Sequence, residues 1–528
     1  MPTPESLPLF ALLTDVAVLA QHGRPDVPVT SLTLDSRAAQ PSAAFFALRG
    51  ATADGHDFIE KATARGAEVI VCETLPVAIN PAVTYVQVAD SAAALGHVAS
   101  AFHGHPSRQL TLVGITGTNG KTTCATLLHR LLRELGYHCG LLSTVQNQID
   151  EQIIPSTHTT PDAIRLNALL ADMVRAGCTH ACMEVSSHAV AQHRITGLHF
   201  AGGVFTNLTH DHLDYHGTFD NYLKAKKAFF DGLPKAAFAL TNADDKRGPV
   251  MLQNTAARRE TYSLRSTASF RARLIENDVQ GLLLEIEGRE VQFRLIGVFN
   301  AYNLLAVYGA AVLLGEEPLE VLTILSGLST APGRFEPVVS AREHITGIVD
   351  YAHTPDALEN VLQTIRQIRR PEQRIITVVG CGGNRDAAKR PEMARLACQL
   401  SDQIILTSDN PRFEEPAEIL SQMRAGVPIA DAGRVRVFED RRAAIEQAVT
   451  SAQPGDIVLV AGKGHENYQE VRGVKAAFDD KAVLKDIFLQ LNKKNVMQHA
   501  AQHLACWLIQ SYHHLDYCCT RDASLRSA

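Results

Sequence analysis

The sequence predicts an α/β fold in three domains. The chain has 528 residues, and at roughly 150 residues per domain about three domains are expected. Short apolar runs alternate with helical stretches along the chain, which favours mostly parallel sheets. A glycine-rich turn near residue 117 stands between an apolar run and a helical stretch, as in a strand–loop–helix unit.

The first two domains are expected over residues 1–108 and 109–331. The first reads as a small α/β domain, with strands at 45–48 and 69–72 and a short helix at 58–65. The central domain opens with a buried strand at 110–115 and a helix at 122–135, and strands alternating with helices predict a mostly parallel sheet. Its further strands are expected at 179–185, 202–206 and 237–241.

A break near Ala331-Pro332-Gly333 marks the start of a third domain, residues 332–492. Alternating apolar and helical stretches predict a doubly wound, Rossmann-like α/β unit there. Residues 493–528 form a tail of unknown order, to which we assign no function. The strands of the third domain are expected at 346–350, 375–380, 403–407 and 457–461.

The composition is that of an ordinary soluble globular protein, with 46% hydrophobic and 20% charged residues. A net charge of -6 argues against a partner such as nucleic acid, whose phosphates would have to be neutralised. The ten cysteines form no Cys-x-x-Cys pair, which favours reduced thiols in the cytoplasm. We expect no secretory signal and no membrane span, because the apolar patch at 7–13 lacks a basic start and no run of ~18 apolar residues occurs. We also expect a monomer.

A phosphate-binding loop is predicted at 114–123. Such a loop directs backbone N–H groups and a helix N-terminus at phosphate. Lys121 would add a charge for the outer phosphates, and the Thr122 hydroxyl can hold Mg²⁺. The strict pattern has glycine at position 115, where this chain has Ile115, so Gly117 serves as the turn glycine of a variant loop. The less favoured alternative is a glycine-rich turn without a ligand.

Two further segments carry candidate metal ligands. Glu184 ends an apolar run, so it is expected at the carboxyl edge of the sheet, where open α/β sheets bind ligands. Residues 210–216 hold three histidines and two aspartates. Zinc is possible from ligand type alone. Beside an ATP loop, Mg²⁺ with oxygen ligands and one histidine is favoured, and a solvated polar loop is the plain alternative.

Lys226 shares a helical face with Tyr222, Phe229 and Phe230, by the i±3 and i±4 rule. An inward ammonium is costly unless it is paired, and a depressed pKa or conversion to a carbamate would remove the cost. From the pattern alone a solvated lysine is favoured.

Eight ordered motifs together resemble those of the Mur ligases, and the resemblance covers residues 30–490. It implies a UDP-binding domain, a central P-loop ATPase domain and a C-terminal Rossmann-like domain. His158, where some members have asparagine, and the pair Ala51-Thr52, where some have His-Gln, depart from the family pattern. The motifs are 34–37, 116–123, 183–188, 211–217, 299–303, 333–336, 350–356 and 462–466.

The resemblance also implies roles for individual residues. Lys121, Glu184, His212 and Lys226 would be catalytic, and Thr122, Glu184, His212 and Lys226 would hold Mg²⁺, with Lys226 carbamylated. The implied ATP-binding residues are Gly117, Thr118, Asn119, Gly120, Lys121, Thr122, Thr123, Asn303, Arg334, Asp350 and His353. Those implied for the UDP-muramoyl peptide are Leu34, Ser36, His158, Thr159, Thr160, Ser186, Gln192 and Arg194.

The implied chemistry is phosphoryl transfer from ATP to the terminal carboxylate of UDP-N-acetylmuramoyl-L-alanyl-D-glutamate, followed by attack of an amine on the acyl phosphate. Two rival functions are a folylpolyglutamate synthetase and an ATP-binding scaffold without ligase activity. The runs at 186–188 and 211–217 disfavour the first rival. The set of Lys121, Glu184 and His212 disfavours the second.

The incoming amino acid is predicted to be meso-diaminopimelate rather than L-lysine. The run 408–412 follows an apolar run, so it is expected at a strand's carboxyl end, although a surface Asn-Pro turn is the plain reading. Diaminopimelate carries one more carboxylate than lysine, and a guanidinium fits a carboxylate bidentately. Asp-Asn-Pro-Arg also resembles the signature of the diaminopimelate-adding branch. The implied binding residues are Arg390, Asp409, Asn410, Pro411, Arg412, Gly462 and Glu466.

Overall fold

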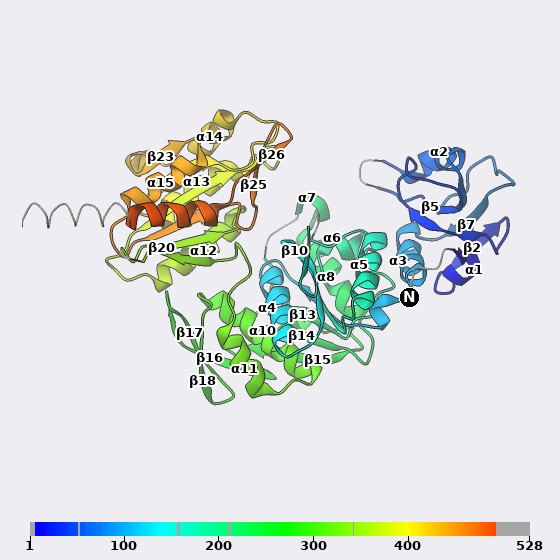
Figure 1. Ribbon diagram of the computed structural model, residues 1–528, viewed down its shortest axis with the longest axis horizontal. Helices are drawn as coiled ribbons and strands as arrows, with labels where there is room; N and C mark the ends of the chain where they lie inside the picture. The colour runs from blue at the N-terminus through cyan, green and yellow to red at the C-terminus, as the bar shows by residue number, and fades with distance from the viewer. Residues whose placement is uncertain (1–5, 51–52, 156–158, 210–212, 342, 493–528) are drawn as a thin grey trace, which may run out of the picture. The chain divides into compact units, whose positions relative to one another are not determined.

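The computed structural model describes residues 6–50, 53–155, 159–209, 213–341 and 343–492. The chain divides into two compact units between Ala331 and Pro332. The first unit contains a two-stranded, a five-stranded and an eleven-stranded sheet, and the second unit contains a six-stranded sheet and a two-stranded hairpin. Figure 1 colours the units from blue to green and from green to red.

The first sheet of the first unit has five strands in the order β2-β7-β6-β5-β4. Its strands β4 to β7 run parallel, while β2 pairs with β7 antiparallel. The strands and helix expected here are confirmed within a few residues. The elements are β1 (Leu7–Pro8), α1 (Leu9–Leu12), β2 (Val18–His22), β3 (Pro28–Val29), β4 (Ser31–Thr33), β5 (Ala43–Phe46), η1 (Gly55–Phe58), α2 (Ile59–Ala64), β6 (Ala67–Cys72), β7 (Thr84–Val88) and α3 (Ser91–Phe102).

The second sheet has eleven strands in the order β11-β10-β9-β12-β8-β13-β14-β15-β16-β17-β18. The pairs from β9 to β16 are parallel, and antiparallel hairpins extend both edges, which confirms the mostly parallel sheet. The strands are β8 (Thr111–Thr116), β9 (Cys139–Leu142), β10 (Gln146–Ile149), β11 (Gln152–Pro155), β12 (His180–Glu184), β13 (Gly202–Phe205), β14 (Phe238–Asn242), β15 (Arg258–Ser263), β16 (Phe270–Asp278), β17 (Gly281–Ile286) and β18 (Arg289–Phe293).

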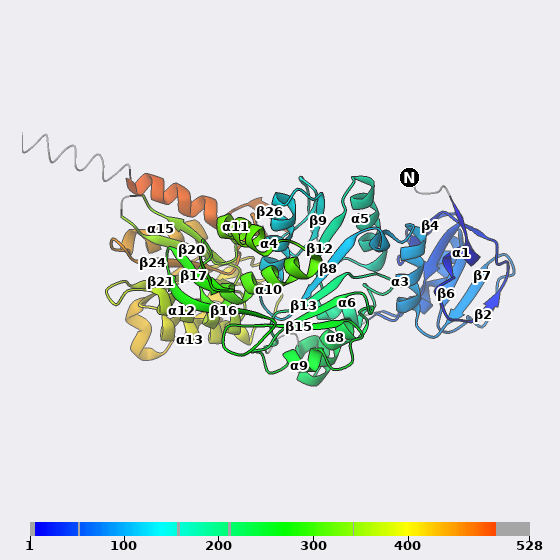
Figure 2. The same cartoon turned by 90° about the horizontal axis from the view of Figure 1, so that it is seen from below.

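Helices cover both faces of this sheet. Successive strand residues point to opposite faces, so Leu112 joins one buried cluster and Val113 the other. The cluster of Val113 is closed by α4, α10 and α11, which pack together beside the strands (Figure 2). The other is closed by α5 and α8. The helices are η2 (Pro106–Arg108), α4 (Lys121–Glu134), α5 (Ala163–Arg175), α6 (Ser187–Ala191), α7 (Leu213–His216), α8 (Phe219–Asp231), α9 (Gly248–Met251), α10 (Val298–Leu314) and α11 (Pro318–Gly327).

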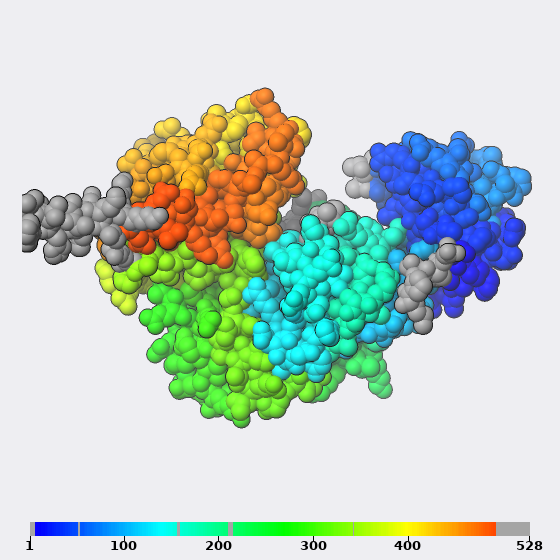
Figure 3. All heavy atoms as spheres, viewed as in Figure 1, coloured from blue at the N-terminus to red at the C-terminus, as the bar shows by residue number. Residues whose placement is uncertain are grey.

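The second unit has a six-stranded sheet in the order β19-β20-β24-β21-β22-β23, parallel except for β19. The four strands expected here are confirmed. The residues 480–492 form a helix at the surface of this unit (Figure 3, orange-red). The remaining elements are β19 (Glu336–Val339), β20 (Thr346–Asp350), α12 (Pro355–Ile368), β21 (Ile375–Cys381), α13 (Lys389–Leu400), β22 (Gln403–Ser408), α14 (Pro416–Arg424), η3 (Ile429–Arg434), β23 (Val435–Phe438), α15 (Arg441–Ser451), β24 (Ile457–Ala461), β25 (Tyr468–Val471) and β26 (Val474–Ala477).

In the part of the chain that the structure describes, no helix has both the length and the apolar character needed to cross a bilayer.

Helix α11 offers a matched test of how much the core of the first unit depends on its outer helices. Leu322 is 1% exposed within the core cluster, whereas Leu319 on the same helix is 51% exposed. We expect Leu322→Ala to lower the free energy of unfolding by about 2–5 kcal/mol, because it leaves a cavity. Leu319→Ala should change it by no more than about 0.5 kcal/mol. Equal effects in urea unfolding would contradict this packing.

Candidate active site

The loop between β8 and α4 is held against the end of β13. Gly117 has φ +152, and a Cβ there would lie 1.9 Å from Thr206 Oγ1. Thr206 Oγ1 donates to Asn119 O at 2.6 Å. Asn207 accepts from the backbone N–H groups of Thr118, at 2.8 Å through its carbonyl, and Asn119, at 3.0 Å through its side chain. Two consecutive residues after β13 therefore support the loop. This agrees with the expected strand–loop–helix unit.

Asn303 lies on α10 against the same loop. Gly120, the residue before α4, has φ +88, and a Cβ there would lie 2.5 Å from Asn303 Oδ1. The Asn303 side chain is buried and donates through Nδ2 to Asn300 Oδ1 at 3.0 Å. Thr122 and Thr123, in the first turn of α4, are also buried. The structure thus brings the first-unit ATP candidates together.

Two lysines converge on one carbonyl oxygen of the loop. Lys121 Nζ donates to the carbonyl oxygens of Gly117 at 2.9 Å and Thr118 at 2.7 Å. Lys226 Nζ donates to Gly117 O at 2.8 Å and lies 4.8 Å from the centre of the Tyr222 ring. Lys226 is 1% exposed, so the solvated lysine favoured from the pattern alone is wrong and the inward face is right.

Helix α8 places Lys226 because its start and its apolar face are both fixed. Thr218 caps the helix by accepting from Asn221 N at 3.2 Å. Phe229 and Phe230 are buried in the core cluster of this face. Lys224, two residues before Lys226, is exposed on another face of the helix. The side chain at 226 therefore follows the apolar face into the protein.

Glu184 ends β12, the strand beside β8, as expected. It is 1% exposed, and its carboxylate accepts from Thr144 N at 2.7 Å and Thr144 Oγ1 at 3.2 Å. His212, the fourth expected metal ligand, lies outside the described residues. Among the residues that the structure describes, no group of three His, Cys, Asp or Glu side chains is spaced to hold a metal.

The residues expected to contact the muramoyl peptide form a hydrogen-bonded chain next to Glu184. Thr160 Oγ1 donates to Glu184 O at 2.8 Å and lies 3.4 Å from Ser186 Oγ. Arg194 donates to Thr160 O at 2.6 Å, and its Nε and Nη2 hold Gln192 Oε1 at 3.0 and 2.6 Å.

The other four residues expected to contact this substrate are not members of that hydrogen-bonded chain. Thr159 accepts from Thr144 Oγ1 at 3.0 Å, which brings it to Glu184. Leu34 is partly exposed and Ser36 is buried, and both follow β4 in the N-terminal sheet. His158 lies outside the described residues.

In the second unit, three expected ATP-binding residues gather at the end of β20. Asp350, the last residue of β20, accepts from Phe335 N at 2.6 Å, and burial raises the pKa of its carboxyl to about 6. The Arg334 guanidinium lies 4.7 Å from the centre of the Tyr351 ring. His353 Nδ1 is 2.8 Å from Tyr351 O.

The carboxyl ends of β22 and β24 meet through polar side chains. Asn410 Nδ2 donates to Glu466 Oε2 at 2.7 Å. The buried Lys463 ammonium donates to Asn410 Oδ1 at 3.0 Å and to Glu466 Oε2 at 3.2 Å. Gly462 has φ +119, and a Cβ there would lie 2.7 Å from Asp409 Oδ2. Residues 53 to 56 positions apart in sequence thus form one cluster, and Lys463 is a member that the sequence did not predict.

Arg412 lies beside this cluster in a left-handed backbone conformation, with φ +53. It follows the buried Pro411. Its Nη1 donates to Gly383 O at 2.8 Å, and its Nε lies 3.8 Å from Glu470 Oε2. The Arg412 side chain is 20% accessible.

Arg390 has a different environment from the one expected of a ligand-binding arginine. It is 1% exposed, and Glu414 receives its Nη1 and Nη2 at 2.8 and 3.0 Å. Arg385, in the loop between β21 and α13, is exposed. The side chains of Arg385 and Arg412 both lie near Gly382. A Cβ at that position would lie 2.9 Å from Arg412 Nη1 and 3.9 Å from Arg385 Cγ. Arg385 stands two residues after the pair Gly382-Gly383, which is the signal that the sequence offered for it.

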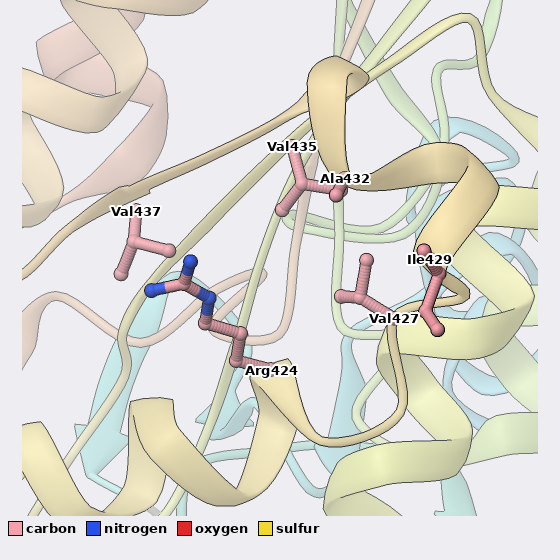
Figure 4. A pocket seen from close by; sticks show the side chains of 6 residues that line it. All are labelled: Arg424, Val427, Ile429, Ala432, Val435 and Val437. Carbon is pink, nitrogen blue, oxygen red and sulfur yellow. The ribbon is translucent and has the colours of Figure 1, made fainter.

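A pocket of about 380 Å³ lies elsewhere in the second unit, between the end of α14 and the amino end of β23 (Figure 4). None of the expected site residues lines it. Its walls are mostly aliphatic, with one arginine, from Arg424, Val427, Ile429, Ala432, Val435 and Val437.

A parallel sheet with a phosphate-type loop before α4 defines the class of ATP-using α/β enzymes. Three family models match the chain: Mur ligase family, catalytic domain, at residues 28–103; Mur ligase middle domain, at 115–311; and Mur ligase, glutamate ligase domain, at 333–464.

Relatives match nearly the whole chain. The chain is 58% identical to the UDP-N-acetylmuramoyl-L-alanyl-D-glutamate--2,6-diaminopimelate ligase of Cytophaga hutchinsonii, over 91% of this chain and 99% of the relative. It is 41% identical to the ligase of that name from Geobacillus kaustophilus, over 90% and 98%. The chain belongs to the Mur ligase family, and it is an ATP-dependent ligase.

Solved structures agree with this family. One structure of a UDP-N-acetylmuramoyl-L-alanyl-D-glutamate--2,6-diaminopimelate ligase aligns with TM-score 0.66 and 31% identity, over 92% of this chain and 99% of that chain. A folylpolyglutamate synthase of Mycobacterium tuberculosis aligns with TM-score 0.57 and 18% identity, over 71% and 92%. The second likeness shows the fold alone.

The contact between Gly117 and Thr206 gives a test of the loop. We expect Gly117→Ala to lower ATP turnover roughly 100-fold or more, because the added methyl group must push the loop off the end of β13. Gly136→Ala is the control. Gly136 has φ +93 but open space around it, so the same substitution there costs only ~1–2 kcal/mol of backbone strain. Normal ADP release by Gly117→Ala would contradict the loop assignment.

Proposed function

We propose that the chain joins meso-diaminopimelate to UDP-N-acetylmuramoyl-L-alanyl-D-glutamate and cleaves ATP to ADP and phosphate. The choice of diaminopimelate as the amino acid rests on the run Asp409–Arg412. This run follows β22 and is clustered with Glu466, which follows β24. The relatives of 41–58% identity that match almost end to end carry the corresponding name, which supports the same substrates here.

The reaction would proceed in two steps. The terminal carboxylate attacks the γ-phosphorus of ATP, so a P–O bond forms to the carboxylate and the bond to ADP breaks. The amine then attacks the acyl carbon, the C–N bond forms, and phosphate leaves as the amine loses a proton. Lys121 would stabilise charge on the transferred phosphoryl group. In the structure its ammonium rests on two loop carbonyls, which phosphate oxygens would replace.

The substrates would be divided among the three domains. Residues 1–108, with Leu34 and Ser36, would hold the uridine end. Residues 109–331 would hold ATP and the peptide, the latter through Thr159, Thr160, Ser186, Gln192 and Arg194. Residues 332–492 would hold the amino acid and, through Arg334, Asp350 and His353, part of the nucleotide. In an assay of ADP release, this function requires both a UDP-muramoyl peptide and an amino acid. A folylpolyglutamate ligase or an inactive ATP-binding scaffold would not show that double requirement.

The residues beside the loop fit Mg²⁺. Thr122 and Glu184 offer a hydroxyl and a carboxylate, and a carbamate on Lys226 would add two oxygens, which are the hard ligands that Mg²⁺ prefers. His212 would complete the set. Bound there, Mg²⁺ would neutralise charge on the ATP phosphates.

Carbamylation of Lys226 would also resolve an electrostatic conflict. Lys121 and Lys226 both place an ammonium on Gly117 O, so two like charges share one acceptor in a buried place. If the neutral Lys226 amine adds to CO₂ and loses a proton, an N–C bond forms and the side chain becomes an anion. Repulsion between the two side chains then becomes attraction.

We therefore expect Lys226→Ala to lower kcat by roughly 100- to 1,000-fold, because the variant lacks the carbamate oxygens. Added short-chain carboxylates should restore part of the activity by supplying oxygens in the vacated space. Lys224→Ala is the matched control, because Lys224 lies exposed on the same helix in an ion pair with Asp220. Full activity of Lys226→Ala in an ADP-release assay would reject the role.

For the amino acid, we propose that Arg412 binds the distal carboxylate of diaminopimelate. Glu466 and Asn410 would meet the ammonium beside it, with Asp409, Pro411 and Gly462 shaping the strand ends. For the other carboxylate we propose Arg390. Its Nη1 and Nη2 hold Glu414, but its buried Nε has no hydrogen-bond partner among the described residues, so it keeps a donor for a ligand. Arg385, exposed in the loop before α13, is a second candidate.

Competition between amino acids tests this site. The unmodified chain should prefer diaminopimelate over L-lysine by roughly 10⁴-fold or more, because lysine offers no distal carboxylate to the Arg412 guanidinium. Arg412→Ala should lose about 2–5 kcal/mol of binding to diaminopimelate. Arg472→Ala is the control, because its exposed pair with Glu415 lies on the same surface. Equal incorporation of lysine by the unmodified chain, measured by mass spectrometry of the products, would refute the role of Arg412 but not the ligase.

A further inference from the structure

A fully buried ion pair lies behind the proposed amino-acid site. Arg441, the first residue of α15, and Asp480, at the start of the helix 480–492, are each 0% exposed. Arg441 Nε donates to Asp480 Oδ1 and Nη2 to Asp480 Oδ2, both at 2.7 Å. This two-point contact fixes the plane of the guanidinium and leaves its remaining N–H groups pointing elsewhere.

Those remaining N–H groups reach two strand ends. Arg441 Nη1 donates to Ser408 O at 3.3 Å, and Nη2 donates to Ala461 O at 3.0 Å. Ser408 is the last residue of β22 and Ala461 is the last residue of β24. These strands are not neighbours, because β21 runs between them. One guanidinium therefore bridges two strands that share no hydrogen bonds with each other.

The two bridged residues directly precede the two halves of the proposed site. Asp409 to Arg412 follow Ser408, and Gly462 to Glu466 follow Ala461. The distance between the halves sets whether Asn410 and Glu466 stay within 2.7 Å of each other. A change of about 1 Å in such a spacing can lower a rate roughly 100-fold.

We propose that Arg441, oriented by Asp480, is a positioning residue that sets the spacing of the two halves of the diaminopimelate site. It touches no substrate, and it acts through the carbonyl oxygens of Ser408 and Ala461. The proposal rests on the function proposed above for this site. It predicts that disturbing the pair changes the KM for the amino acid but not the KM for ATP or for the UDP-muramoyl peptide.

The same sheet supplies a matched control at its other end. Arg374 donates from Nε and Nη2 to Asp456 Oδ2 at 2.9 and 2.6 Å, directly before β21 and β24 begin. Asp456 is also buried. The Arg374 side chain is 37% exposed. An Arg→Lys change at 374 therefore disturbs a half-buried ion pair at the amino ends of the strands, away from the proposed site.

The experiment compares Arg441→Lys, Asp480→Asn and Arg374→Lys in the full chain, with KM and kcat measured separately for diaminopimelate, ATP and the UDP-muramoyl dipeptide. Lysine keeps the charge but lacks the fork that spans two carbonyls. We expect Arg441→Lys and Asp480→Asn to raise KM for diaminopimelate roughly 10- to 100-fold. The other two KM values should stay unchanged, and Arg374→Lys should leave all three unchanged.

The other outcomes overturn the proposal. If the unmodified chain forms no product with diaminopimelate, the proposed function fails and this inference falls with it. If the unmodified chain is active but Arg441→Lys keeps its KM for diaminopimelate, or raises all three KM values alike, only this inference fails. If both variants of the pair fail to fold under conditions in which Arg374→Lys folds, the pair supports the fold as a whole and is not a positioning device.

Discussion

The close approach of Gly117 to Thr206 is the contact on which the first unit's site depends. Without a side chain at 117, the loop after β8 closes onto the end of β13, and the carbonyl of Gly117 turns toward α8. Lys121 and Lys226 then meet at that one oxygen, although they lie on different helices. The meeting of the two lysines therefore requires both the buried face of α8 and a glycine at position 117.

In the second unit, buried charged side chains are likewise held by specific partners. Arg390, Arg441 and Lys463 are buried, and each contacts a carboxylate as well as backbone or amide oxygens. Removing one partner of such a pair costs roughly 3–5 kcal/mol, because the other charge stays buried without compensation. The carboxyl ends of the strands are therefore held rigidly by ionic contacts. A preorganised site of this kind does not need to be ordered by its ligand.

The sequence was most informative where one pattern dominated. Continuous apolar runs predicted β20, β21, β22 and β24, because strands covered on both faces consist of little else. The i±4 spacing around Lys226 predicted its inward direction but not its burial. The hairpins β16 to β18 were missed, because edge strands mix charged with apolar residues. Pairing between distant residues was out of reach: nothing local in the sequence indicates that Glu414 neutralises Arg390.

The pairing of Arg390 with Glu414 shows how two arginines near the carboxyl ends of these strands can differ. A buried guanidinium that already holds a carboxylate, as in Arg390 and Arg441, has most of its N–H groups committed to the protein. The guanidinium of Arg412 contacts one carbonyl oxygen and a carboxylate at 3.8 Å, so a ligand carboxylate would add a closer ionic contact. On the proposed function, Arg412 is therefore better placed than Arg441 to meet the substrate, and Arg441 is better placed to shape the backbone around it.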